Sequence, residues 1–291
     1  MEASESNSIS PRIPKGNIAS VSIPQDELEA LLLSINTLEL KGVYPRWASK
    51  AYYGLVELHL DAYSGVSIPE TDFRAILSSS PGLRHLNFGL KIIRASPNFD
   101  RPPILLEQLQ VLVTGKRSLE ELGLFLRTIH PGSRPLSIHL DKSGKCSSHP
   151  DIPRVPFNHQ IQAFFTRANV EMLSIAGTYN YSQVAELLGL VSRARAILLN
   201  GLCLGNIKPN TYMGLSGADH CFNDLYLLQG TTVAQHFLVW LIKSHSVQRL
   251  RVTEDSKIVQ SNNSDIADKL PLIDDALKLD FTYESIPSKE H

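Results

Sequence analysis

A six-position pattern of apolar and polar residues returns along most of the chain. It reads apolar-x-x-Leu-x-apolar, where x is usually polar and Ile can replace the Leu. Alternate side chains of an extended segment point to opposite sides, so the Leu and the last apolar residue share one face. Each copy therefore predicts a short strand with one buried face and one wet face. Clear copies begin at Ile35, Leu55, Leu83, Val170, Ala194, Phe222 and Val247, and weaker ones lie at 109–114, 136–140 and 276–280.

The copies are spaced almost evenly. The central residues Leu58, Leu86 and Leu112 follow one another at 28 and 26 residues, and later intervals are of similar length. Leucine-rich repeats have periods of about 20 to 29 residues, so most intervals fit that class. One longer interval contains the polar stretch 142–156. The spacing therefore predicts one supersecondary unit per copy of the pattern.

Segments with helical spacing of apolar residues lie between the predicted strands. Asp26 is expected to cap a short first helix, Ser118 and Glu121 form a capping box, and Ser182 is the expected N-cap of a later helix. Units of strand, loop and helix that cannot each bury a core become stable when they stack. The longer helices are predicted at 71–79, 118–129, 158–167, 182–190 and 231–243.

Two architectures with parallel strands fit this alternation. Strands of an open doubly wound α/β sheet are buried on both faces and read as continuous apolar runs. Here polar residues such as His59 and Arg84 stand between the leucines. We therefore predict an α/β fold built as an irregular leucine-rich-repeat solenoid, with a curved parallel sheet inside and helices outside. It is irregular because the Asn or Cys that regular repeats carry after the strand is missing.

The same patterns predict the domain organisation. The leader at 1–22 is rich in Ser and Pro without apolar periodicity, so we expect it to be disordered. The solenoid is expected to span 23–280, and 281–291 is expected to form a loose C-terminal tail.

Composition narrows the class of protein. Hydrophobic residues make up 43% of the 291 residues, 42 of them leucine, and the formal net charge is −1. That balance gives no basic excess for nucleic acid, and no apolar run approaches the ~20 residues that span a membrane. Three cysteines and no signal-peptide core are typical of a reducing compartment. We expect an intracellular protein, cytoplasmic or nuclear, that binds neither nucleic acid nor membrane.

One segment offers an enzymatic alternative. Gly214-Leu-Ser216-Gly-Ala218 comes close to the G-x-S-x-G turn of α/β hydrolases, and Cys221 stands beside His220. An α/β hydrolase-like enzyme with Ser216 or Cys221 as nucleophile is therefore the alternative reading. We favour a loop serine because the motif ends in Ala218 and no clear strand precedes it. Cys203 and Cys221 are expected to fill core space.

Other candidates for chemistry are weaker. Gly115-Lys116-Arg117 lacks the upstream glycine and the following Ser or Thr of a phosphate-binding loop, so it predicts a turn before the cap at Ser118. Cys146, His149 and His159, with His139 nearby, are too sparse for the usual spacing of zinc ligands. We therefore predict no catalytic residue, no metal site and no cofactor.

The polar x positions of the predicted strands would form one extended surface. Neighbouring strands lie about 4.8 Å apart, so side chains at equivalent positions stand in continuous rows. Their mixed charges suit a protein or peptide target, which the sequence does not identify. The predicted function is non-enzymatic protein–protein recognition through this concave face. The expected contact residues are Glu57, His59, His85, Asn87, Ser174, Tyr226, Arg249 and Arg251, with Thr37 and Glu39 extending the row.

Several longer phrases resemble the leucine-rich-repeat region of fungal F-box-like proteins. The resemblance covers roughly residues 25–255. It implies the substrate-receptor part of an F-box-type ubiquitin ligase of the cullin class. The phrases that carry it are VYPRW at 43–47, GLVELHLD at 54–61, AILSSSPGLRHL at 75–86, HPGSRPL at 130–136 and, more weakly, VQRLRV at 247–252.

The sequence departs from that family at its start. An F-box is a helical module that opens with a Leu-Pro phrase, and nothing in Met1–Ser22 resembles it. A ubiquitin-ligase adaptor is therefore an expected partner only if an F-box lies upstream. A repeat scaffold with no link to ubiquitin is the further alternative.

Overall fold

Nine parallel strands form one open sheet whose order follows the chain. The computed structural model describes residues 25–61, 66–94, 101–142, 157–191, 193–204 and 221–259. Every pairing in this sheet is parallel. Each strand pairs with the strand of the sheet that comes before it in the chain and with the one that comes after it. The strands are β1 (Thr37–Lys41), β2 (Glu57–Asp61), β4 (His85–Phe88), β7 (Val111–Thr114), β9 (Leu136–Lys142), β10 (Val170–Gly177), β11 (Ala196–Asn200), β13 (Asp224–Leu228) and β15 (Arg249–Val252).

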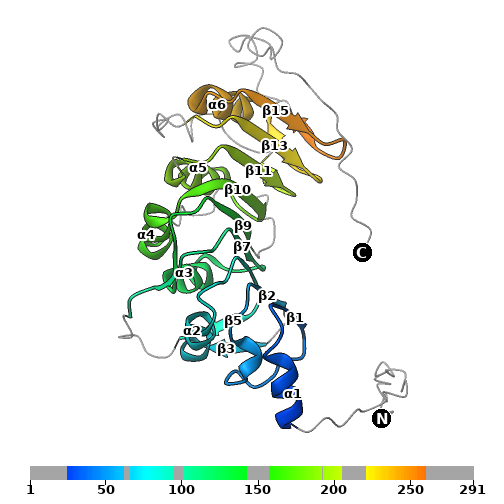
Figure 1. Cartoon of the computed structure of the whole chain (residues 1–291). Coiled ribbons are helices and arrows are strands. Elements are labelled where there is room, and N and C mark those ends of the chain that lie inside the picture. Colours follow the sequence, from blue (N-terminus) through cyan, green and yellow to red (C-terminus); the bar gives the residue numbers. More distant parts are fainter. Residues whose placement is uncertain are drawn as a thin grey trace, which may run out of the picture.

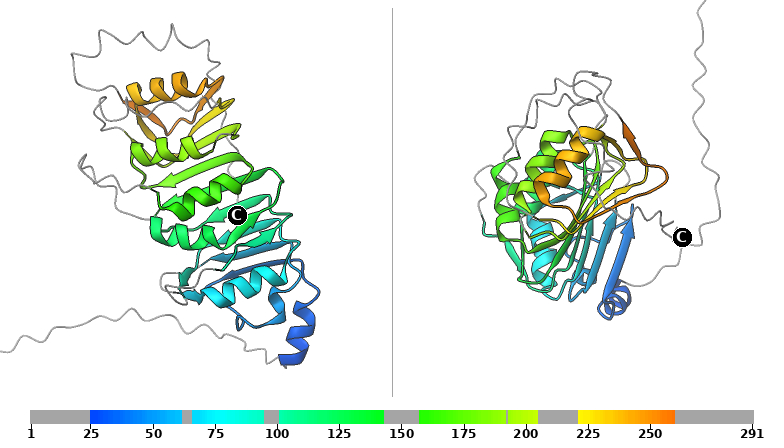
Figure 2. Two further views of the ribbon diagram at one scale, coloured as in Figure 1. Left: turned by 90° about the vertical axis from the view of Figure 1, so that its left-hand side faces the viewer. Right: turned by 90° about the horizontal axis from the view of Figure 1, so that it is seen from above.

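The helices α2 to α6 stand side by side along one face of this sheet, and α1 lies at the β1 end (Figures 1 and 2). The described part of the chain places no second helical layer on the other face. A mixed α/β fold with a large parallel sheet is thus confirmed. No helix among the described residues is long and apolar enough to cross a membrane. The helices are α1 (Gln25–Leu32), α2 (Glu70–Ser79), α3 (Leu119–Arg127), α4 (His159–Arg167), α5 (Tyr181–Leu190) and α6 (Gln235–His245), with a short 3₁₀ turn η1 (Lys50–Tyr52).

The repeated leucine is the residue that sets the strand register. In each pairing the central residue of one copy lies opposite the central residue of the next, so the nine form one row across the sheet. All of them are between 0% and 6% exposed, on the face that the helices cover. Apolar burial along this row is the main stabilising term that the sequence provides. The row is Leu38, Leu58, Leu86, Leu112, Ile138, Leu173, Ile197, Leu225 and Leu250.

Short parallel strands pair beyond the main sheet. Their two or three residues are too few to show a periodicity, which is why sequence patterns did not predict them. Between β4 and β7 the described residues hold two such strands and no helix. No described helix therefore covers the sheet from this interval. These strands are β3 (Ser67–Pro69) with β5 (Lys91–Ile93), β6 (Ile104–Leu106) with β8 (Ile129–Pro131), and β12 (Cys203–Leu204), β14 (Thr232–Ala234) and β16 (Lys257–Val259) together.

Hydroxyl groups connect the loops of neighbouring strands. The Ser80 hydroxyl donates to the Tyr52 carbonyl at 2.8 Å and accepts from the Leu55 N–H at 3.0 Å. Thr114 and Thr253 also bridge carbonyl and N–H groups of an adjacent turn. Buried backbone groups in these loops need such partners, because buried donors and acceptors without one are costly.

We predict that Ser80→Ala lowers the free energy of unfolding by about 1–3 kcal/mol, because it leaves the buried Leu55 N–H without its acceptor. Ser80 is fully buried, whereas Ser78 of the same segment is exposed. Ser78→Ala is therefore the matched control and should change stability by less than about 0.5 kcal/mol. Urea unfolding of the two variants measures the difference, and equal stability would contradict the bridging role.

The predicted starts of three helices were wrong. Asn180 rather than Ser182 caps α5, accepting from the Gln183 N–H at 2.9 Å and forming a capping box with that residue. The first helix begins at Gln25, so Asp26 lies in its first turn instead of at the cap. The segment predicted as helical from residue 231 starts as strand β14. The predicted leader 1–22, the looser copy at 276–280 and the tail 281–291 lie outside the described residues.

Candidate functional site

The face of the nine-stranded sheet opposite α2 to α6 is the candidate functional site, and we call it the open face. Its side chains come from the x positions of the repeated pattern, which alternate with the buried leucines. Strand register arranges most of them in two rows across the sheet. The first row is Thr37, Glu57, His85, Val111, Ser137, Met172, Ala196, Asp224 and Arg249; the second is Glu39, His59, Asn87, Val113, His139, Ser174, Leu198, Tyr226 and Arg251.

Every contact residue expected from the sequence lies on this face. The first row brings Glu57 beside His85, with their side chains in contact, and places Arg249 at the far end. The second row holds the remaining five. Ser174 differs from the expectation of a free contact residue, because it is only 7% exposed in the middle of the sheet.

The β1–β2 end of the open face is acidic. Glu39, Glu57 and Asp61 point outward from these two strands, and Lys41 is the only basic outward residue in the described β1 and β2. The Glu57 carboxylate lies 3.2 Å from Nδ1 of His85 on the next strand. This contact holds the carboxylate across the β2–β4 boundary. The end therefore carries a formal excess of two negative charges.

The β13–β15 end carries arginine. Arg249 forms an ion pair with Asp224: its Nη2 donates to Oδ2 at 2.8 Å, and its Nε lies 2.6 Å from Oδ1. The Arg251 guanidinium lies over the Tyr226 ring, 5.5 Å from its centroid. A cation above an aromatic face is attracted by the ring quadrupole, so the two side chains present one flat basic surface. Among the outward residues of β13 and β15 there are thus two arginines and one carboxylate, that of Asp224.

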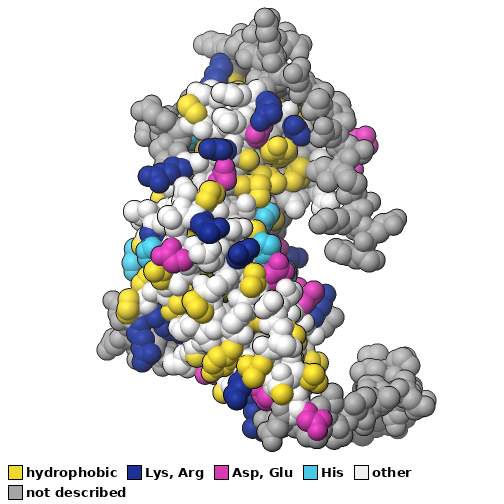
Figure 3. All heavy atoms as spheres, in the orientation of Figure 1, with side chains coloured by type: hydrophobic (Ala, Val, Ile, Leu, Met, Phe, Trp, Pro, Cys, Tyr) yellow, Lys and Arg dark blue, Asp and Glu magenta, His cyan; other side chains and the backbone are white. Residues whose placement is uncertain are grey.

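An apolar centre separates the two charged ends. Val111, Val113, Met172, Ala196 and Leu198 occupy outward positions and are partly exposed. Figure 3 shows hydrophobic side chains gathered over β11 and β13. Sequence reasoning did not include these five residues because it collected polar x positions only. The repeat template itself marks them, since they stand at the same two offsets from the central leucine.

His139 lies on the open face, and its surroundings shift the pKa of its imidazole. Burial lowers the pKa of its imidazole below the ordinary value of 6.5. Its neighbours across the strands, Val113 and Ser174, carry no charge to offset that effect. We therefore expect His139 to be neutral at pH 7, and a partner to meet an uncharged imidazole there.

A titration of His139 tests this environment. The unfolded chain keeps the ordinary pKa, so it binds the proton more tightly than the folded chain does. The stability that neutral His139 contributes is present above pH 6.5 and is lost as the pH falls through the folded pKa. NMR of the imidazole should give a pKa below 6.5, and His139→Gln should flatten the loss of stability on acidification. A pKa at or above 6.5 would contradict the prediction.

The residues proposed for enzymatic or metal chemistry do not form a site in the described structure. Ser216, His220, Cys146 and His149 lie outside the described residues. Cys203 and Cys221 are exposed, so the expectation that they fill core space was wrong. Cys203 begins the two-residue strand β12 and Cys221 stands shortly before β13, and apolar neighbours in sequence do not imply burial there. Among the described residues no group of three or more His, Cys, Asp or Glu is arranged to hold a metal.

The Gly-Lys-Arg segment is a turn, as expected. Its Arg117 is 3% exposed and donates from Nη2 to the Phe88 carbonyl at 2.6 Å. The guanidinium lies 5.0 Å from the ring centroids of both Phe88 and Phe125. A Cβ on Gly115 would lie 2.7 Å from the Cα of Gly89, so close backbone approach requires glycine there. The segment therefore packs adjacent repeats together, and the capping box at Ser118 follows it.

The open face thus combines an acidic end, an apolar centre and an arginine end on one rigid sheet, and these features alone must indicate what the protein does. Comparison of the chain with models of protein families, with curated proteins and with solved structures finds no match.

Proposed function

We propose that the chain is an irregular leucine-rich-repeat solenoid whose open face recognises a segment of another protein, without catalysis. The observation that carries the proposal is the nine-strand register, which keeps equivalent outward side chains in unbroken rows. Successive parallel strands with helices on one side are what stacked repeats produce. A doubly wound sheet would reverse its strand order, and this sheet does not.

The chemistry of the open face defines the partner that fits it. Eight spacings between strands give about 38 Å, the length of about 11 extended residues. Such a segment would carry basic residues over Glu39, Glu57 and Asp61 and apolar residues over the centre. It would carry an acidic residue near Arg251. Complementary charge at the two ends would select the direction of the bound segment, and burial at the centre would supply affinity.

The resemblance to fungal F-box-like proteins supports a more specific role. On that analogy the open face is the substrate-recognition surface of a cullin-type ubiquitin ligase. The resemblance concerns architecture only, and an architecture does not by itself determine a function. Recognition by the open face stands independently of it.

Leu198→Arg is expected to weaken partner binding by about tenfold or more, because it places an unpaired charge in the part of the contact that loses water. Leu198 lies at the apolar centre between Ser174 and Tyr226. Ala75→Arg adds the same charge to an exposed position of α2 and is the matched control. Affinity capture with both variants and the original chain, followed by quantitative identification of bound proteins, makes the comparison.

The capture experiment distinguishes a partner of the open face from proteins that bind elsewhere. A protein that Ala75→Arg retains and Leu198→Arg loses is a partner of the open face, and its cross-links should map to β9 to β13. If every captured protein binds both variants equally, the open face is not the recognition surface. The ubiquitin role needs a separate result: the protein encoded by the whole gene must bind a cullin-ligase adaptor directly. Failure of that binding leaves a repeat scaffold with no link to ubiquitin.

A further inference from the structure

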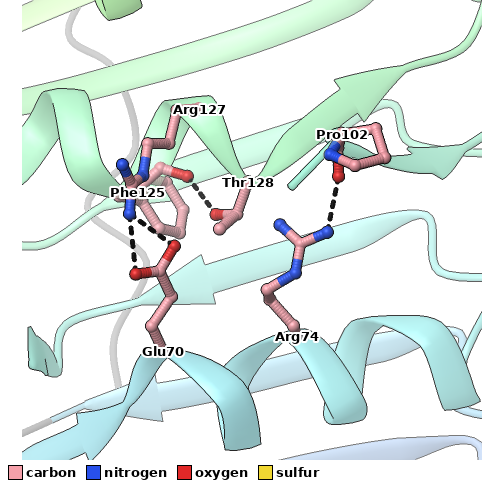
Figure 4. A network of polar contacts seen from close by, with 6 residues as sticks. All are labelled: Glu70, Arg74, Pro102, Phe125, Arg127 and Thr128. Atoms are coloured by element: carbon pink, nitrogen blue, oxygen red, sulfur yellow. Dashed lines mark hydrogen bonds and ion pairs between the residues drawn. The ribbon is translucent and has the colours of Figure 1, made fainter. Parts of the chain in front are cut away.

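A hollow of about 310 Å³ lies among the helices, away from the open face. It is lined by the end of α3, the first and last turns of α4 and the segment 101–103 that leads into β6. Residues 101–103 belong to the interval between β4 and β7, in which the described residues form short strands and no helix. The segment is tied to α2, because Arg74 donates to the Pro102 carbonyl (Figure 4).

Basic side chains dominate this hollow. Arg101, Arg127, Arg167 and His159 line it, and no Asp or Glu is among the described residues that do. Arg74 stands beside them, and the pKa of its guanidinium is lowered, chiefly by burial; Arg101 and Arg127 lower it further, while Glu70 opposes them. The described lining thus holds three arginines, one of which, Arg127, pairs with Glu70 outside the lining.

Two of these arginines are held in place by the fold. Arg127 donates from Nη2 to both carboxylate oxygens of Glu70, at 2.6 and 2.7 Å. Arg167 donates from Nε and Nη2 to the carbonyls of Leu126 and Ile129, at 2.8 to 3.2 Å. A guanidinium has five N–H donors, so each keeps donors that these contacts do not use. Donors fixed before a ligand arrives lose little conformational entropy when they bind it.

We propose that this hollow is a binding site for a phosphomonoester, carried by a phosphorylated protein segment or by a small molecule. A phosphomonoester has close to two negative charges at pH 7 and three acceptor oxygens, which match several converging guanidinium groups. Arginine suits such a ligand better than lysine does, because its planar donors pair with two oxygens at once. The site lies on the helical side, so it is independent of recognition by the open face.

Calorimetric titration of the whole chain tests the site with four probes at matched ionic strength. These are inorganic phosphate, a phosphoserine peptide flanked by Ala and Gly, the same peptide without phosphate, and chloride. We expect saturable binding of a phosphate probe and none of the other two. Tighter binding of the phosphopeptide than of inorganic phosphate assigns the site to a phosphorylated protein, and equal binding assigns it to a small phosphate. Equal binding of both peptides, or no phosphate response beyond chloride, overturns the proposal.

Variants locate the response in the hollow. Arg101→Gln combined with His159→Gln changes two exposed residues of the lining and should weaken phosphate binding by about tenfold or more. Arg84→Gln removes an exposed arginine that does not line the hollow and should bind phosphate like the original chain. Unchanged thermal unfolding of both variants shows that the fold is kept.

A second measurement does not depend on those substitutions. Phosphate should shift the NMR signals of the Nε–H groups of Arg127 and Arg167, while the Arg84 signal stays in place. Binding by the double variant as tight as that of the original chain, or loss of binding in Arg84→Gln, would show that the phosphate sits elsewhere and would overturn the assignment.

Discussion

Leu86→Ala is expected to lower the free energy of unfolding by about 2–5 kcal/mol. Leu86 has no exposed surface and stands opposite Leu58 on one side and Leu112 on the other. Removing its side chain takes apolar contacts from both neighbouring repeats and leaves a cavity, because strands on each side prevent the site from collapsing. Urea unfolding followed by circular dichroism measures the change.

The control for this prediction is the same substitution at an exposed leucine. Leu31 of α1 is 61% exposed, so Leu31→Ala should change stability by less than about 0.5 kcal/mol, and alanine also favours the helix. If the two substitutions lower the free energy of unfolding equally, the aligned leucine row does not provide the packing between neighbouring strands. A loss confined to Leu86→Ala would show that burial at the repeat position, and not leucine content, stabilises the sheet.

The leucine row was predictable because its signal repeats. A single Leu-x-apolar phrase fits many structures, but copies at similar intervals are satisfied together only by strands stacked in register. Ile138 illustrates this: its copy is loose, yet the register places it opposite Leu112 and Leu173. The row also determined which residues face outward, so all the expected contact residues lie on one face.

Features that depend on short or distant contacts were not predictable. The pairing of β6 with β8 involves three residues from each strand, too few for any pattern to show. Asn180 and Ser182 are both good caps, and only the backbone shows which one α5 uses. The apolar centre of the open face was missed for another reason. An apolar residue at an x position, such as Leu198, lowers the match of a copy to the template. An exposed apolar residue is nevertheless the one that best indicates a binding surface.

The ion pair between Glu70 and Arg127 is the contact that sequence analysis had least chance of finding. The two residues are 57 positions apart and belong to the helices α2 and α3 (Figure 4). Glu70 stands in the first turn of α2, where sequence analysis would read it as an ordinary surface carboxylate. Its side chain is only 2% exposed, and that of Arg127 is 16% exposed.

Arg127→Ala is therefore expected to lower the free energy of unfolding by about 3–5 kcal/mol at pH 7. It removes both hydrogen bonds to the Glu70 carboxylate and leaves that charge buried, with Arg74 as the remaining cation nearby. Urea unfolding at pH 7 measures the loss, and a change of less than about 0.5 kcal/mol would contradict the role of the ion pair.

A double-mutant cycle separates the buried charge from the lost packing. Glu70→Gln in the Arg127→Ala background removes the charge and keeps the shape, so the double variant should be more stable than Arg127→Ala alone. Unfolding of the four proteins at pH 7 gives the coupling energy between the two residues. Additive losses would mean that Arg127 acts through its aliphatic contacts. A coupled loss would show that one ion pair joins α2 to α3 and so holds Arg127 in position at the basic hollow.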